Sequence, residues 1–138
     1  MEFTKTIKIA SACALTVAAI AGSVLVYRAS VHEQKCLSYE KQMISAANKM
    51  VNAEDKTLSM LKDIQQNPFM AFGYLPQLPQ MTGEAKEMNV ASNNTLYAYV
   101  GTCGEQRKSD FFARPKVASV FNAVIYKAAE IQNFAETK

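Results

Sequence analysis

The sequence has few of the residues that build most active sites. It holds one histidine, His32, and three cysteines, none of them in a Cys-x-x-Cys pair. No His-Glu-x-x-His, glycine-rich phosphate loop or Gly-x-Ser-x-Gly motif occurs. Zinc ribbons, thioredoxin-type centres, haem-attachment sites, zinc proteases and serine hydrolases therefore lack their usual signatures here. The sequence predicts a protein that is not an enzyme, with no cofactor and no metal site.

Average composition excludes further classes of protein. Of the 138 residues, 49% are hydrophobic and 20% are charged, and the net charge is +3. These values differ from those of a disordered tail, a collagen-like repeat or a multi-span membrane protein. The length suits one domain rather than two.

Charged residues are entirely missing from residues 9–27, which lie between Lys8 and Arg28. As a helix this run spans about 28 Å, at roughly 1.5 Å per residue, which is close to the thickness of a bilayer core. We therefore expect residues 1–28 to be an N-terminal membrane anchor or signal segment. A single-pass anchor has two alternatives, a secretory signal cut after Ala21 and a buried helix of a soluble protein.

The flanking positive charges do not fix the orientation of this segment, because both sides carry them. A short tail before a first apolar segment is typical of a signal-anchor, which places the C-terminal domain outside the cytoplasm. If the leader is cleaved, the protein is secreted or periplasmic. Small residues recur every fourth position in the run and could let two helices pack closely in lipid, as in a homo-oligomer. They are Ala10, Ala14, Ala18 and Gly22.

Two cysteines, Cys36 and Cys103, follow the apolar run, which itself contains Cys13. Behind an export leader, two cysteines predict one disulfide. Two unpaired buried thiols are the alternative. His32 precedes Cys36 by four residues, so one helical face could hold a thiol and an imidazole, but a disulfide would consume that thiol.

The rest of the chain, residues 29–138, is predicted to be an extracytoplasmic domain that is mainly α. Residues 29–66 contain no glycine or proline, which indicates one long helix. An apolar stripe recurs along it at seven-residue spacing: Leu37, Ile44, Val51 and Leu58. Glu40 and Glu54 fall at the alternate seam positions, which disfavours a strict two-stranded coiled coil.

Asn67 and Pro68 should end the long helix. Residues 67–83 are predicted to be a proline-rich apolar loop, which either packs over the core or offers a surface to a partner. Residues 84–114 are the least certain, with a helix over 84–99 favoured over a short strand at 96–100, and a turn at the following glycines.

Residues 115–136 are predicted to form the C-terminal helix, because Pro115 suits a first turn and apolar residues follow at three- and four-residue spacing. A disulfide between Cys36 and Cys103 would make this helix run roughly parallel to the first.

Basic and aromatic residues concentrate just before and at the start of the last helix. They are Arg107, Lys108, Phe111, Phe112, Arg114 and Lys116. One interpretation is contact with lipid headgroups or an acidic partner. The other is a solvated loop whose phenylalanines anchor the last helix to the core.

Taken together, these features predict a non-catalytic, single-pass, membrane-anchored accessory or assembly subunit. Its expected partners are the lipid bilayer and a protein of a membrane or envelope complex. Nucleic acid is disfavoured, because the exported domain carries little net charge. The alternatives are a phage-type lysis or envelope-spanning factor, and a small exported ligand-binding module or enzyme.

Overall fold

The computed structural model describes residues 2–136, with side chains described from residue 16 onward. No strand occurs in this range, so the prediction of a mainly α protein is confirmed. The chain divides into two compact units, Met1–Leu37 and Ser38–Lys138. The first helix, α1 (Glu2–Gln66), contributes to both.

The first unit is helical throughout its described part. Every residue from 16 to 35 is exposed, including the large side chains of Val17, Leu25 and Val26. Within the described residues, no helix combines the length and the apolar character needed to cross a membrane. Ala10 and Ala14 of the predicted anchor lie outside the residues whose side chains are described, whereas Ala18 and Gly22 are described and exposed.

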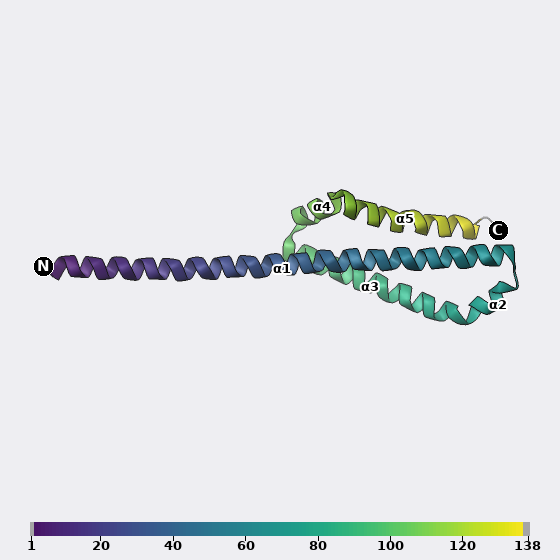
Figure 1. The fold of residues 1–138 in the computed structure, drawn as a ribbon, viewed down its shortest axis with the longest axis horizontal. Coiled ribbons are helices and arrows are strands. Elements are labelled where there is room, and N and C mark those ends of the chain that lie inside the picture. Colours follow the sequence, from purple (N-terminus) through teal and green to yellow (C-terminus); the bar gives the residue numbers. More distant parts are fainter. Residues whose placement is uncertain (1, 137–138) are drawn as a thin grey trace. The chain divides into compact units, whose positions relative to one another are not determined.

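The second unit is built on the part of α1 that follows residue 37. The later helices are α2 (Met70–Tyr74), the 3-10 turn η1 (Leu75–Gln77), α3 (Leu78–Cys103), α4 (Glu105–Ala113) and α5 (Pro115–Glu136). In Figure 1, α3 returns along α1 in the opposite direction, and α5 lies along α1 and runs in the same direction.

Two ion pairs fix the direction of α5. Lys127 binds Asp55, and Glu130 lies 3.9 Å from Lys62, so residue numbers rise together along the two helices. The parallel arrangement predicted for the first and last helices is therefore confirmed. The predicted starting residue of the last helix, Pro115, is also confirmed.

The end of α1 is confirmed as well, but the loop predicted over 67–83 is wrong for most of its length. Helix α1 stops at Gln66, and the side chain of Asn67 accepts a hydrogen bond from the backbone N–H of Phe69. Helical structure then resumes at Met70. The prolines do not prevent it, because they lie in first turns, Pro76 in η1 and Pro79 in α3. A first-turn proline removes only an N–H that has no helical partner.

Residues 84–103 lie in α3, so the favoured helix over 84–99 is confirmed and the alternative strand at 96–100 is absent. The chain turns at Gly104, the only described residue with a positive φ, at 86°. Gly101, which was also expected in the turn, lies inside α3. Of the two glycines expected in the turn, only Gly104 lies in it.

The stripe predicted along α1 is buried only in part. Leu37, at its start, is 41% exposed, whereas Leu58, at its end, is buried, as are Met43, Ala47 and Met60. One position before this stripe, a second set of positions repeats with heptad spacing, and none of them is exposed. These positions form the seam of α1 within the second unit: Glu40, Met43, Ala47, Met50, Glu54, Thr57, Leu61 and Ile64. Two glutamates therefore lie in the seam itself.

Candidate functional site

Glu40 is the only buried charged residue among those described, with 3% of its surface exposed. Its Oε1 accepts hydrogen bonds from the Tyr99 hydroxyl at 2.9 Å and from Arg107 Nε at 3.0 Å. Its Oε2 accepts a hydrogen bond from Arg114 Nη1 at 2.8 Å. We call these four residues the Glu40 cluster. It joins α1 to α3, to α4 and to the residue between α4 and α5.

The electrostatics of the cluster favour the ionised carboxylate. Burial by itself would raise the pKa of Glu40, but the hydrogen bonds from Arg114, Arg107 and Tyr99 outweigh it, so the pKa lies below its usual value. The pKa of Tyr99 is raised, first by burial and then by its bond to Glu40. The cluster is thus a carboxylate paired with two guanidinium groups and a neutral phenol.

A row of aromatic rings continues from the cluster into α5. The centroid of Tyr99 lies 5.8 Å from that of Phe111, and Phe111 lies 5.1 Å from Phe112. Phe112 in turn lies 5.0 Å from Phe121. All three pairs meet edge to face, a geometry that favours aromatic pairs beyond their buried area. Arg114 also lies 5.4 Å above the ring of Phe111.

The structure divides the basic and aromatic residues that the sequence grouped as a contact surface. Phe111 is fully buried and Phe112 is half-buried, which is the arrangement of the anchoring interpretation. Arg107 and Arg114 bind Glu40, and Lys108 pairs with Glu105 on its own helix. Lys116 is exposed. The intramolecular partners of the two arginines were not foreseen, because Glu40 lies more than sixty residues earlier in the chain.

The predicted disulfide between Cys36 and Cys103 is present. The Cys36 sulfur also lies 4.0 Å from Nδ1 of His32, as the four-residue spacing predicts. Because the sulfur is bonded, the pair holds no thiolate, and a cysteine nucleophile is excluded at this position.

The turn between α1 and α3 has one packed face and one exposed face. Tyr74 donates a hydrogen bond of 2.7 Å to Asp63 Oδ2, which fastens α2 to the end of α1. Ala71, three residues earlier, is also half-buried. Several large apolar side chains of the same segment are exposed, by between 43% and 80%. They are Phe69, Met70, Phe72, Leu75 and Leu78, which we call the tip patch, although Leu75 and Leu78 also line a small cavity together with Ala71 and Tyr74. Part of the segment therefore packs on the core, and part of it is exposed.

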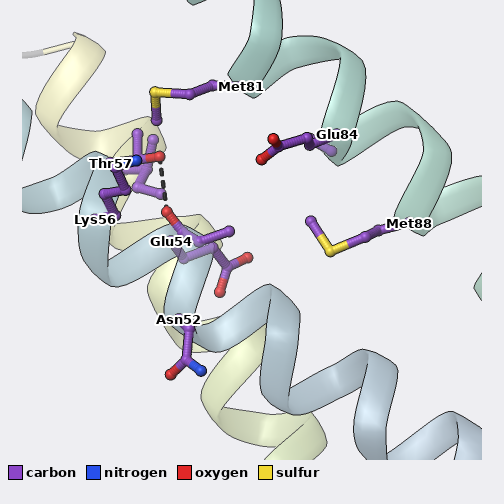
Figure 2. A pocket seen from close by; sticks show the side chains of 10 residues that line it. Asn52, Glu54, Lys56, Thr57, Met81, Glu84 and Met88 are labelled. Atoms are coloured by element: carbon purple, nitrogen blue, oxygen red, sulfur yellow. Dashed lines mark hydrogen bonds between the residues drawn. The ribbon is translucent and has the colours of Figure 1, made fainter. Parts of the chain in front are cut away.

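A cavity of about 420 Å³ lies where α1, α3 and α5 approach one another. Figure 2 shows Glu54 of α1 pointing across it toward α3, and Glu84 pointing back from α3, with Met81 and Met88 on either side of Glu84. Ile131 of α5 also lines the cavity. Sequence reasoning did not find this site, because its residues are spread over three helices.

Among the described residues, no three histidine, cysteine, aspartate or glutamate side chains lie close enough to hold a metal ion. Comparisons with protein families, with curated proteins and with solved structures find no match to this chain.

Proposed function

We propose that the protein is a non-catalytic, membrane-anchored accessory subunit that docks on a protein partner through the tip patch. The observation that carries the proposal is the exposure of Phe69, just before the short helix α2, and of Phe72 within it, which are 80% and 71% exposed. Soluble surfaces rarely expose several large apolar side chains together, and contiguous patches of this kind mark interaction sites.

The charge of the turn favours a protein surface over lipid headgroups as the occupant of the tip patch. No charged residue occurs in 64–83. Segments that bind anionic membranes instead carry lysine or arginine, which contribute about 1 kcal/mol each near the surface. A partner with an apolar groove is the chemistry that matches an uncharged, aromatic-rich tip.

The proposed anchor rests on the sequence of the first unit. Residues 9–27 carry no charge, and the described apolar side chains of this segment, including Tyr27 at 71%, are uncovered. Lipid would cover such a helix, and the Cys36–Cys103 disulfide supports a domain in an oxidising compartment outside the cytoplasm. Within the second unit, α1 separates Ser38 from the tip by about 42 Å, at 1.5 Å per residue. That length would let the tip reach a partner away from the start of the unit.

Photo-crosslinking in native membranes tests the docking surface. A photoreactive amino acid replaces Phe72 in the full-length chain, and a second chain carries it at Tyr126, which is 73% exposed on α5. We expect one defined protein adduct from position 72 and none from position 126. Native mass spectrometry of the gently extracted protein should show the same partner in a complex of fixed stoichiometry.

The matched variants are Phe69→Ser with Phe72→Ser, and Tyr126→Ser. The first should lose the complex while keeping the helical circular dichroism of the parent chain, and the second should keep the complex. A parent chain that stays monomeric and forms no adduct at position 72 would refute the proposal. A chain recovered only after cleavage at residue 21 would refute the anchor but not the docking surface.

A further inference from the structure

A small cavity of about 120 Å³ lies where the end of α1 meets α2, η1 and the start of α3. Met60 lines it from α1, Ala71 from α2 and Met81 from α3. Leu75 and Leu78, which belong to the tip patch, line it as well, and they are 53% and 45% exposed. The cavity therefore borders the proposed docking surface, and we call it the tip cavity.

The lining of the tip cavity suits an apolar group. Its surface is almost entirely apolar, and none of the described residues that form it is charged. Its two hydroxyl groups already donate hydrogen bonds within the protein, Thr57 to the backbone carbonyl of Ala53 at 2.9 Å and Tyr74 to Asp63 at 2.7 Å. A polar group placed in the cavity would lose its hydrogen bonds to water and gain little in return, which is costly. The cavity therefore selects an apolar occupant.

The size of the tip cavity corresponds to one large apolar side chain. An apolar cavity of about 150 Å³ holds a benzene molecule, so about 120 Å³ admits one branched aliphatic or aromatic group and no more. Pockets for small-molecule ligands are larger, at roughly 300–1,000 Å³. A side chain delivered by a neighbouring protein therefore matches this cavity better than a free ligand.

The charge around the tip cavity specifies the segment that carries this side chain. Residues 64–83 have no charge, and Asp63, just before them, accepts the hydrogen bond from Tyr74. A charged partner segment would lose its hydration here without meeting an opposite charge, whereas an uncharged segment has no such cost. On the same turn, the exposed rings of Phe69 and Phe72 can cover an uncharged segment and exclude water, as the residues around binding hot spots do.

We propose that the partner protein docks by inserting one apolar side chain, of the size of leucine or phenylalanine, from an uncharged segment into the tip cavity. This inference rests on the proposed docking function and names the chemistry that the partner must present. The inserted side chain is the buried anchor of the interface, and Phe69 and Phe72 contact the residues beside it. A second copy of this chain, inserting its own Phe69 or Phe72, is the other occupant that the experiment must separate.

The chemistry of the tip cavity is tested with N-acetyl-leucinamide, N-acetyl-phenylalaninamide and the polar counterpart N-acetyl-glutaminamide. The full-length protein carries ¹³C-methyl methionine, and the signals are assigned with Met60→Leu and Met81→Leu variants. We expect the leucine and phenylalanine derivatives to shift the Met60 and Met81 signals saturably, and the glutamine derivative to bind at least tenfold more weakly. Met43, which is buried but does not line this cavity, should stay unchanged. Equal binding of all three derivatives would overturn the proposal.

Filling the tip cavity separates its role from that of the exposed phenylalanines. Ala71→Leu fills the cavity and keeps Phe69 and Phe72, so the adduct formed by a photoreactive residue at position 72 should fall at least tenfold in native membranes. Ala71→Val, which fills less of the cavity, should give a smaller loss. Ala129→Leu, at an exposed position of α5, is the matched control and should keep the adduct. All three variants should retain the helical circular dichroism of the parent chain.

The adduct itself distinguishes the possible occupants. Its cross-linked peptide should contain a leucine or phenylalanine flanked by uncharged residues, and a charged segment there would overturn the proposal. An adduct between two copies of this chain would overturn it as well. An adduct that survives Ala71→Leu refutes insertion into the cavity and leaves the docking function in place. If the parent chain forms no adduct at position 72, the docking function fails, and this inference fails with it.

Discussion

Replacing Glu40 with glutamine tests whether the Glu40 cluster holds the second unit together. Glutamine preserves the shape of the side chain but removes the charge. Its amide N–H groups also cannot accept the hydrogen bonds that the Glu40 carboxylate accepts from Tyr99, Arg107 and Arg114. Removing one partner of a buried ion pair costs about 3–5 kcal/mol, because the remaining charges stay buried. The Arg114 side chain is 49% exposed and can be rehydrated, so we expect the lower end, about 3 kcal/mol.

That loss is large beside a total stability of about 5–15 kcal/mol for an ordinary domain. It corresponds to a fall in Tm of about 12 °C or more for a unit of this size. The assay is urea unfolding of the full-length chain, followed by circular dichroism. Glu87→Gln, at an exposed position of α3, is the matched control and should change the free energy of unfolding by less than about 0.5 kcal/mol.

The pH dependence gives a second readout of the same variant. Because the folded-state pKa of Glu40 is lowered, its stabilisation is fully present above the unfolded pKa of about 4.3 and is lost as pH falls through the folded pKa. The difference between parent and Glu40→Gln should therefore be constant from pH 7 to about pH 5 and then shrink in acid. A difference under 1 kcal/mol at pH 7, or one that does not shrink in acid, would refute the role assigned to the cluster.

Three further predictions concern single features of the fold. Glu54→Gln should raise the urea midpoint at pH 7 and not in acid, because burial raises the folded-state pKa of Glu54 and stability is lost as pH rises through it. Reduction of the disulfide, or the Cys36→Ser/Cys103→Ser pair, should cost about 4 kcal/mol from loop-closure entropy, and reductant should not affect the double variant. Gly104→Ala should lower the free energy of unfolding by about 1–3 kcal/mol, because the backbone of Gly104 has a φ of 86° and a ψ of 161°. Gly101→Ala, within α3, should instead raise the free energy of unfolding by about 0.5–1 kcal/mol. Equal effects of the two glycine variants in urea unfolding would contradict this.

Local signals were sufficient for the end of the first helix, for the start of the last helix and for the disulfide. The stop at Gln66 follows from Asn67 and Pro68, whose effect on the backbone is confined to neighbouring residues. The start at Pro115 has the same kind of cause. The disulfide followed from counting, because only two cysteines lie beyond the apolar run.

The loop predicted over 67–83 is wrong because its prolines were interpreted as helix breakers. A proline breaks a helix interior but is favourable in a first turn, and the sequence alone does not say which of these a given proline occupies. Pro76 and Pro79 each lie in the first turn of a new helical element, so the segment is a series of helical elements rather than a loop. Which of its side chains face outward depends on Tyr74 binding Asp63, a contact between two elements.

The seam of α1 shows why the candidate sites themselves could not be predicted. The two glutamates at seam positions were taken as an argument against a strict two-stranded coiled coil, since an isolated buried charge is costly. Glu40 is nevertheless buried, because it is paired with Arg107 of α4 and with Arg114 between α4 and α5, both more than sixty residues later in the chain. Glu54 occupies an equivalent position in the seam, but its Oε2 has no such partner.

The two seam glutamates therefore differ in the sign of their pKa shifts, lowered at Glu40 and raised at Glu54. A structural role accounts for the first, because its carboxylate is fully bonded and ties four segments together. It does not account for the second, since an apolar residue at that seam position would pack as well without an orphaned oxygen. Burial raises the pKa of Glu54, so its charge costs stability at neutral pH. If Glu54→Gln stabilises the protein at pH 7 and not in acid, the buried charge is the cause.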